Sequence, residues 1–211
     1  MKPSLYLACA WLFACVAASA FAQTNLIVNG SFEQPVVSPG GFIVVGSIPG
    51  WTTTFGSGIE VENNAVGPAF AGSQLVEMDS NDNSGMQQLV PTIAGRSYTL
   101  SVEYSPRPGV DIGSSGIEVR INGIVIDTIA QNGIGLSTTS WTKFSYQVVA
   151  TGSSTAVEFR ATGASDGVGG FIDDVRFGLP PAIPTLSPMV LPGLAGMLAL
   201  AGVVLVRRRR R

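Results

Sequence analysis

Apolar and polar residues alternate along most of the chain between its two apolar ends. In the segment 98–105, apolar residues fall at every second position, with serine, threonine and glutamate between them. The same period of two recurs in 117–121 and 157–160, and it is typical of β-strands with one buried face. Further strands are expected at 26–33, 42–46, 50–55, 59–62, 74–79, 85–90, 124–130, 141–149 and 170–177.

A two-residue turn signal and the absence of helical periodicity define the expected fold. Asn122-Gly123, between two isoleucines, predicts a β-hairpin. No segment before residue 180 shows a helical repeat, so the many short strands predict an all-β jelly-roll β-sandwich over 23–179. To this domain we add an N-terminal signal helix and a C-terminal transmembrane helix.

The N-terminal end has the order of a secretory signal peptide. Lys2 precedes an apolar run at 5–18, and a small-residue motif, Ala-Phe-Ala, follows at 20–22. This order predicts a signal peptide over 1–22 that is cleaved after its last residue. Two alternatives are an uncleaved membrane helix and a lipobox-like motif that would place a lipid on Cys15.

The C-terminal end combines an uncharged apolar segment, 189–206, with five arginines at 207–211. As a helix, the segment would be about 27 Å long, close to the hydrocarbon thickness of a bilayer. It therefore predicts a transmembrane helix, and the positive-inside rule places the arginine cluster in the cytoplasm and the domain outside. A nucleic-acid-binding arginine tail is the weaker interpretation.

Charge and composition narrow the function further. The fourteen acidic residues all lie in the predicted domain with six basic ones, so its formal charge is −8 although the whole chain carries −2. An acidic domain argues against nucleic acid as a partner and is compatible with divalent cations or neutral glycans. The chain has no histidine, and both cysteines, Cys9 and Cys15, fall in the signal peptide. This excludes serine–histidine catalysis and disulfides in the domain, and we expect no enzyme activity.

The tail resembles a known sorting signal. Residues 180–188 form a proline-rich spacer that contains the motif Ile183, Pro184, Thr185, Leu186 and Ser187. With the apolar helix and arginines that follow, the motif resembles IPTL-CTERM tails, which belong to the PEP-CTERM class. Pro188-Met189 replaces the usual Glu-Trp. The resemblance implies a Gram-negative envelope location, passage through the inner membrane, and an exosortase-type sorting protease as a partner.

Several ordered strings also resemble one domain family. They are 25–33, Pro49-Gly50-Trp51, 74–79, 104–109 and 171–175. Together they resemble the galactose-binding-like jelly rolls of choice-of-anchor C proteins and a related plant cell-wall family. The resemblance implies the jelly-roll fold and cell-envelope or extracellular polysaccharide as the partner.

Asp173 is the most informative single residue. The period of two places it on the same face of the last strand as Phe171, Val175 and Phe177. A carboxylate among apolar side chains needs a partner, and the options are backbone N–H groups, Arg176 or a metal ion. Related jelly rolls hold a structural Ca²⁺ at this position, which the resemblance transfers to Glu33 and Asp173, with Asn29 and Ser31 completing the shell.

Aromatic and charged residues supply candidates for a sugar-binding site. The candidates are Trp51, Tyr104 and Trp141 for stacking, and Glu60, Glu77 and Arg107 for polar contacts. The first two aromatics could instead belong to the core, whereas Trp141 is out of phase with the apolar positions that follow it. The acidic segment 77–83 has alternating oxygen-bearing residues, but a polar loop explains it better than a metal loop.

The sequence thus predicts an exported, membrane-sorted surface protein whose β-sandwich binds envelope or matrix carbohydrate. Two alternatives are a structural surface or biofilm protein without glycan binding, and a glycosidase-like enzyme that uses paired carboxylates.

Overall fold

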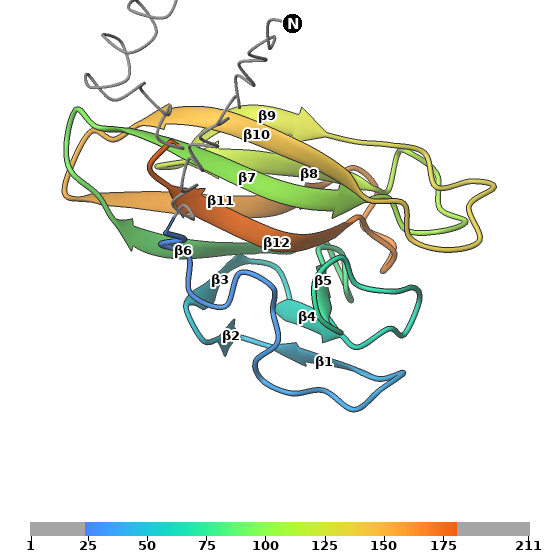
Figure 1. Ribbon diagram of the computed structural model, residues 1–211. Coiled ribbons are helices and arrows are strands. Elements are labelled where there is room, and N and C mark those ends of the chain that lie inside the picture. The colour runs from blue at the N-terminus through green and yellow to red at the C-terminus, as the bar shows by residue number, and fades with distance from the viewer. Residues whose placement is uncertain (1–23, 181–211) are drawn as a thin grey trace, which may run out of the picture. The chain divides into compact units, whose positions relative to one another are not determined.

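A computed structural model of the protein describes residues 24–180 (Figure 1). The predicted signal peptide, sorting motif, transmembrane helix and arginine cluster lie outside these residues and stay predictions. Within the described part of the chain, no helix has the length and apolar character needed to cross a bilayer.

Residues 24–180 form twelve strands, and every segment from residue 42 onward that was expected to be a strand contains one. The strands are β1 Phe42–Val45, β2 Ser47–Ile48, β3 Trp51–Phe55, β4 Ile59–Glu62, β5 Leu75–Glu77, β6 Gly85–Pro91, β7 Ser97–Ser105, β8 Gly116–Ile121, β9 Ile124–Ile129, β10 Thr142–Val149, β11 Ser154–Thr162 and β12 Phe171–Gly178. The sequence pattern missed only the two-residue β2.

The strands pair into two six-stranded antiparallel sheets, which form the two layers visible in Figure 1. The first sheet has the order β1-β4-β5-β12-β7-β10, and the second has the order β2-β3-β6-β11-β8-β9. Strands β5 to β12 form four adjacent strands in each sheet, in the orders β5-β12-β7-β10 and β6-β11-β8-β9. This is the eight-strand arrangement of a jelly roll. The all-β jelly-roll prediction is confirmed.

The hydrophobic core lies between the inner faces of the two sheets. Trp51 of β3 is fully buried there, with Phe32 and Phe159 packed against its ring at centroid distances of 5.8 and 6.1 Å. Tyr98 of β7 stacks on Phe177 of β12 at 5.1 Å. Aromatic pairs of this kind bury a large area and help to fill the space between the sheets.

The hairpin between β8 and β9 has the predicted turn. Asn122 and Gly123 have φ angles of 50° and 79°, and Ile121 pairs with Ile124 across the turn. Two successive positive φ angles match the twist of the flanking strands, which is why Asn-Gly is favoured at this position.

The strand expected at 26–33 is wrong, because this segment contains a turn. Asn29 and Phe32 have φ angles of 53° and 57°, which break an extended backbone. The Asn29 side chain closes the turn: its Nδ2 donates to the carbonyl of Gln34 at 2.6 Å, and its Oδ1 accepts the Gln34 N–H at 3.1 Å.

The predicted face of Asp173 is wrong in part: Asp173 shares a face with Phe171, as expected, but not with Val175 and Phe177. Asp174 has a φ of 43°, and the pairing of β12 with β7 shifts between Asp173 and Arg176. This bulge inserts one residue and reverses the alternation of side chains. Val175 and Phe177 therefore face the core, whereas Asp173 lies on the outer face of the first sheet, in register with Glu103.

Candidate functional site

A row of side chains crosses the outer face of the first sheet. Glu60 of β4 pairs in register with Glu77 of β5, which pairs with Phe171 of β12. Phe171 pairs with Ser105 of β7. The first pair between β10 and β7 is Thr142 with Tyr104, so continuing this register by one residue brings Trp141 to the level of Ser105. Since neighbouring strands are about 4.8 Å apart, the row spans roughly 19 Å.

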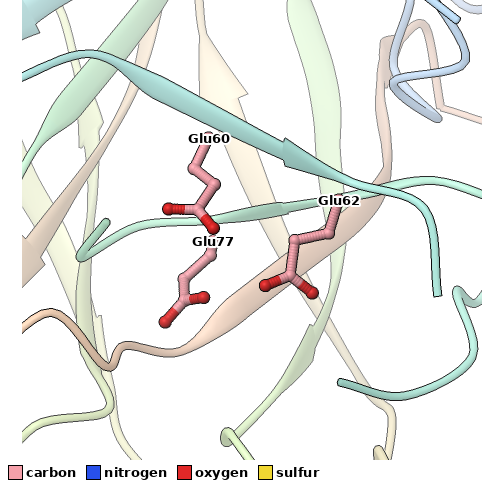
Figure 2. A group of neighbouring side chains, drawn as sticks. All are labelled: Glu60, Glu62 and Glu77. Atoms are coloured by element: carbon pink, nitrogen blue, oxygen red, sulfur yellow. The ribbon is translucent and has the colours of Figure 1, made fainter. Parts of the chain in front are cut away.

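Three glutamates meet at the β4–β5 end of this row (Figure 2). Glu60 and Glu62 are two residues apart on β4 and therefore point to the same face, where Glu77 lies on the adjacent strand. Their exposed fractions are only 6%, 2% and 1%, respectively. One carboxylate oxygen from each lies within 4.8 Å of the other two. We call this group the glutamate cluster.

Arg107, in the loop after β7, supplies the positive charge beside the cluster. Its Nη1 forms an ion pair with Glu77 and lies 3.9 Å from Glu62 Oε1. Its guanidinium carbon lies 5.8 Å from the ring centroid of Phe171, a cation–π distance. The N–H of Gly169 donates to Glu77 Oε1 at 2.6 Å. Glu77 thus has two partners, and Arg107 still exposes 22% of its side chain.

The cluster crowds negative charge that one arginine does not balance. Burial and, to a lesser extent, the negative charge of the neighbouring Glu62 raise the pKa of Glu60 to about 7, although Arg107 acts to lower it. Burial also raises the pKa of Glu77 to about 9, although the Gly169 N–H and Arg107 both act to lower it. Glu62 Oε2 is buried and has no hydrogen-bond partner. Such a group is stabilised by bound protons or by a cation.

The segment 64–74, which we call the covering loop, is fixed to the outer face by Asp173. The N–H groups of Phe70 and Ala71 each donate to Asp173 Oδ2 at 2.8 Å, and the N–H of Asp174 donates to Oδ1 at 2.6 Å. Burial raises the pKa of Asp173 to about 7, although the three N–H groups stabilise the carboxylate and act to lower that pKa.

Glu33 and Trp141 fix the rest of the covering loop. Glu33 Oε1 accepts the N–H groups of Ser73 and Gln74, each at 2.9 Å. At the other end of the loop, Trp141 Nε1 donates to the carbonyl of Pro68 at 3.1 Å. The loop therefore lies in a defined position beside Trp141.

Three of the four residues predicted to bind calcium hold neighbouring backbone groups in this structure. Asn29 closes the turn that contains Ser31, while Glu33 and Asp173 hold the covering loop. The interpretation that Asp173 accepts backbone N–H groups is confirmed, whereas Arg176 bonds to Asp174 instead. Calcium binding at these residues stays a prediction.

Two of the predicted sugar-binding aromatics are core residues. Trp51 is fully buried and donates its Nε1 hydrogen to the carbonyl of Asn29 at 3.3 Å. Tyr104 is also fully buried, and its hydroxyl donates to the carbonyl of Ser115 at 2.8 Å. Their assignment as stacking residues is wrong, because both side chains point between the sheets.

The other four predicted binding residues, Glu60, Glu77, Arg107 and Trp141, lie on the outer face. Trp141 is half-buried and makes an edge contact with Phe70, at a centroid distance of 6.2 Å and an interplanar angle of 67°. Phe70 is 49% exposed. Sequence reasoning missed Phe70, which lies in an irregular loop, and Glu62. The alternation Ile59-Glu60-Val61-Glu62 is the signal that places both glutamates on one face.

The acidic segment 77–83 forms a polar loop, as favoured from its spacing. Asp82 Oδ1 accepts the N–H of Ser57 at 2.7 Å, and Asp79 Oδ2 accepts the N–H of Asp166 at 3.0 Å. These side chains stabilise neighbouring loops, and only Glu77 contributes to the cluster described above.

No protein-family model matches the chain. Among curated proteins, it is similar to the multifunctional-autoprocessing repeats-in-toxin of Vibrio vulnificus, with 29% identity over 154 residues and 72% of this chain. The same type of toxin from Vibrio cholerae serotype O1 is 29% identical over 164 residues, or 74% of this chain. The chain spans only 3% of the length of either toxin.

Three solved structures with a similar backbone fold have low sequence identity to this chain. TmCBM61 in complex with β-1,4-galactotriose is 17% identical, covering 74% of this chain and 99% of that one, with a TM-score of 0.49. The K2 cleaved adhesin domain of Lys-gingipain is 19% identical, covering 72% and 97%, also at 0.49. The C-terminal family 22 carbohydrate-binding module of Clostridium thermocellum Xyn10B is 18% identical, covering 66% and 91%, at 0.46.

Proposed function

We propose that this domain is a non-catalytic carbohydrate-binding module of an exported protein, and that the outer face of the first sheet binds the glycan. The observation that carries this proposal is the arrangement along the row on this outer face. An aromatic pair, Phe70 and Trp141, lies at one end of the row, and Arg107 and the glutamate cluster lie at the other. A span of roughly 19 Å suits an oligosaccharide of several rings better than a single sugar.

The aromatic end provides the apolar contact that sugar rings require. Sugar rings carry C–H groups on their flat faces, which stack on aromatic side chains. Phe70 is exposed, and the hydrogen bond from Trp141 to Pro68 fixes the orientation of the indole ring. A fixed ring loses little conformational entropy when a ligand binds.

The charged end provides donors and acceptors for sugar hydroxyl groups. Arg107 is partly exposed and already oriented by Glu77 and the Phe171 ring. Polar groups that are positioned before binding give orientation and specificity to a ligand held mainly by apolar contact. Aromatic and polar groups on one face therefore favour glycan recognition over nucleic-acid binding.

A glycan array tests the proposal with purified protein, followed by titration of any ligand found. We expect Trp141→Ala and Phe70→Ala each to weaken binding at least tenfold, which corresponds to about 1.4 kcal/mol. The matched control is Phe55→Ala, since Phe55 is 43% exposed but lies on β3 of the second sheet. Absence of binding to any glycan on the array, or equal loss in the control, would contradict the proposal.

The glutamate cluster supports binding better than hydrolysis. Inverting glycosidases separate their two carboxyl groups by roughly 6.5–9.5 Å and retaining ones by roughly 5–5.5 Å, so the spacing of the cluster oxygens, within 4.8 Å, argues only against the inverting mechanism. Burial argues against both mechanisms, because a catalytic carboxyl group must contact the sugar and these three side chains are only 6%, 2% and 1% exposed. Glu77 is also held by Arg107 and Gly169. Turnover of any substrate in a chromogenic glycoside panel would overturn the non-catalytic assignment.

We also propose that the chain is exported by its N-terminal 22 residues and sorted through its C-terminal tail. The support is the order of the sequence features: a small-residue cleavage motif, the Ile-Pro-Thr-Leu-Ser motif, and an apolar segment followed by five arginines. Mass spectrometry of the mature protein from its native host tests this. The mass of the C-terminus shows whether the tail is kept or removed during sorting, and an intact N-terminus would contradict signal cleavage.

A second candidate function is a structural role through self-association. It is favoured by a groove of about 610 Å³ lined by residues of the β8–β9 turn, β9 and β10, including Ile124 and Ile126, which are 69% and 41% exposed. Both strands lie at sheet edges, where backbone groups are free to pair with another strand. Concentration-dependent dimerisation abolished by Ile124→Lys and Ile126→Lys, without glycan binding, would favour this role.

A further inference from the structure

We propose that Glu60, Glu62 and Glu77 bind one hard divalent cation, of which Ca²⁺ is the best fit. The site is on β4 and β5 and is distinct from the calcium prediction at Glu33 and Asp173. It does not depend on glycan binding.

The spacing of the three carboxylates fits a single ion. Calcium binds oxygen ligands at about 2.3–2.6 Å, so two ligand oxygens on opposite sides of the ion are roughly 4.6–5.2 Å apart. One oxygen from each glutamate lies within 4.8 Å of the others. All three can therefore contact the same ion while the two strands keep their observed pairing, Glu60 with Glu77.

Charge balance leaves room for an ion of charge +2. Cation binding requires all three glutamates to be ionised and therefore displaces the protons that burial favours on Glu60 and Glu77. The three carboxylates then carry −3, and Arg107 supplies +1, so the group retains −2. Arg107 contacts Glu77 closely but is 3.9 Å from Glu62. One divalent cation would neutralise the remainder.

Glu62 supplies a separate indication of a missing partner. Its side chain is 2% exposed, and its Oε2 is buried without any hydrogen-bond partner. The side chain is directed toward the other two glutamates, as Figure 2 shows. A buried, unpaired carboxylate oxygen costs several kcal/mol, and a cation between the three side chains would remove this cost.

The composition of the described domain selects the type of ion. The site offers only oxygen ligands, and the chain has no histidine. Imidazole and thiolate ligands favour zinc and copper, whereas carboxylates favour calcium, magnesium and manganese. Three side chains leave some of the six to eight positions around Ca²⁺ for water, and the flexible calcium shell accepts such an irregular set better than octahedral Mg²⁺ does.

Isothermal titration of EDTA-treated, full-length protein with CaCl₂ tests the site. We expect one bound ion per chain, and Glu60→Gln and Glu62→Gln should each weaken binding at least tenfold. The control Glu118→Gln removes a carboxylate from β8 of the second sheet, where Glu118 pairs with Arg120, and should bind like wild type. MgCl₂ should bind more weakly than CaCl₂.

Two results would overturn the proposal. The first is the absence of calcium binding to the wild-type protein. The second is binding that persists in Glu60→Gln and Glu62→Gln but disappears in Asp173→Asn, since the ion would then occupy the other predicted site. Circular dichroism checks the fold of each variant. Wild-type protein labelled with ¹³C at glutamate carboxyl carbons gives an independent readout, because Ca²⁺ should shift the signals of the three cluster glutamates.

Discussion

Asp173 and Val175 lie on opposite faces of β12 although they are two residues apart, because Asp174 between them has a left-handed backbone. Because of the bulge, the Val175 side chain packs in the core, whereas the Asp173 side chain accepts hydrogen bonds from the covering loop. One irregular residue thus lets a single strand stabilise both the sandwich and the loop that carries Phe70.

Asp173→Asn should destabilise the domain by about 1–3 kcal/mol, the cost of leaving a buried donor unpaired. The carboxylate accepts three N–H groups through its two oxygens, whereas an amide offers one oxygen and turns an NH₂ group toward a donor. Urea denaturation measures the loss. We expect the same loss in calcium and in EDTA, and a loss confined to calcium buffer would favour an ion at Asp173 instead.

The matched control for that substitution is Asp174→Asn. Asparagine tolerates a positive φ, and the ion pair that is lost involves Arg176, whose side chain is 55% exposed. An exposed pair contributes less than about 1 kcal/mol. Equal destabilisation by the two variants would contradict the anchoring role of Asp173.

Gly72→Ala should release the covering loop. Gly72 has a φ of 74°, and an added Cβ would lie 2.6 Å from the carboxyl carbon of Glu33. That carboxylate cannot move away without breaking its bonds to Ser73 and Gln74. Gly95→Ala is the control, because Gly95 has a φ of 78° and open space around it. Both variants incur about 1–2 kcal/mol for the left-handed backbone.

The difference between these two glycine variants isolates the loop contact. Urea denaturation should show Gly72→Ala to be at least 1 kcal/mol less stable than Gly95→Ala, the cost of one broken hydrogen bond. We also expect Gly72→Ala alone to weaken glycan binding, since Phe70 is two residues away. Equal stability would mean that the Glu33 contact does not hold the loop.

Alternation of residue types was sufficient to predict the strands, because one buried face leaves a period of two in the sequence. It failed where a positive φ falls on a residue other than glycine inside an expected strand. Phe32 is an ordinary strand residue type, and an aspartate such as Asp174, although uncommon in strands, does not by itself locate a bulge. Their φ angles of 57° and 43° nevertheless prevent a strand at 26–33 and create the bulge in β12. These conformations are imposed by tertiary contacts.

The candidate site was predicted only in part for a similar reason. Glu77 and Arg107 are thirty residues apart and meet because β5 and β7 both flank β12. Sequence spacing gives no such pairing. The inward position of Trp51 depends likewise on which face of β3 packs against the opposite sheet. A tryptophan suits a buried core and a surface that stacks on sugar rings equally well.

Glu62→Gln should have opposite effects in the two buffers. Without calcium, the substitution removes one of three crowded, buried carboxylates, and we expect stabilisation of about 1 kcal/mol. With saturating CaCl₂, wild-type protein gains stability from the bound ion, and the variant should gain much less. Thermal melting in EDTA and in CaCl₂ measures both effects. A calcium-induced rise of equal size in variant and wild type would contradict the glutamate site.

The two tryptophans Trp51 and Trp141 should respond to substitution in opposite ways. Trp51→Phe leaves a cavity between Phe32 and Phe159, so we expect a loss of about 1–3 kcal/mol. Its glycan affinity should be unchanged at temperatures where the variant is folded. Trp141→Ala loses one hydrogen bond and the Phe70 contact, about 1–2 kcal/mol, but glycan binding should weaken at least tenfold. Calorimetric melting and glycan titration of both variants separate the two roles. Retained binding in Trp141→Ala, or lost binding in folded Trp51→Phe, would place the glycan on a different surface.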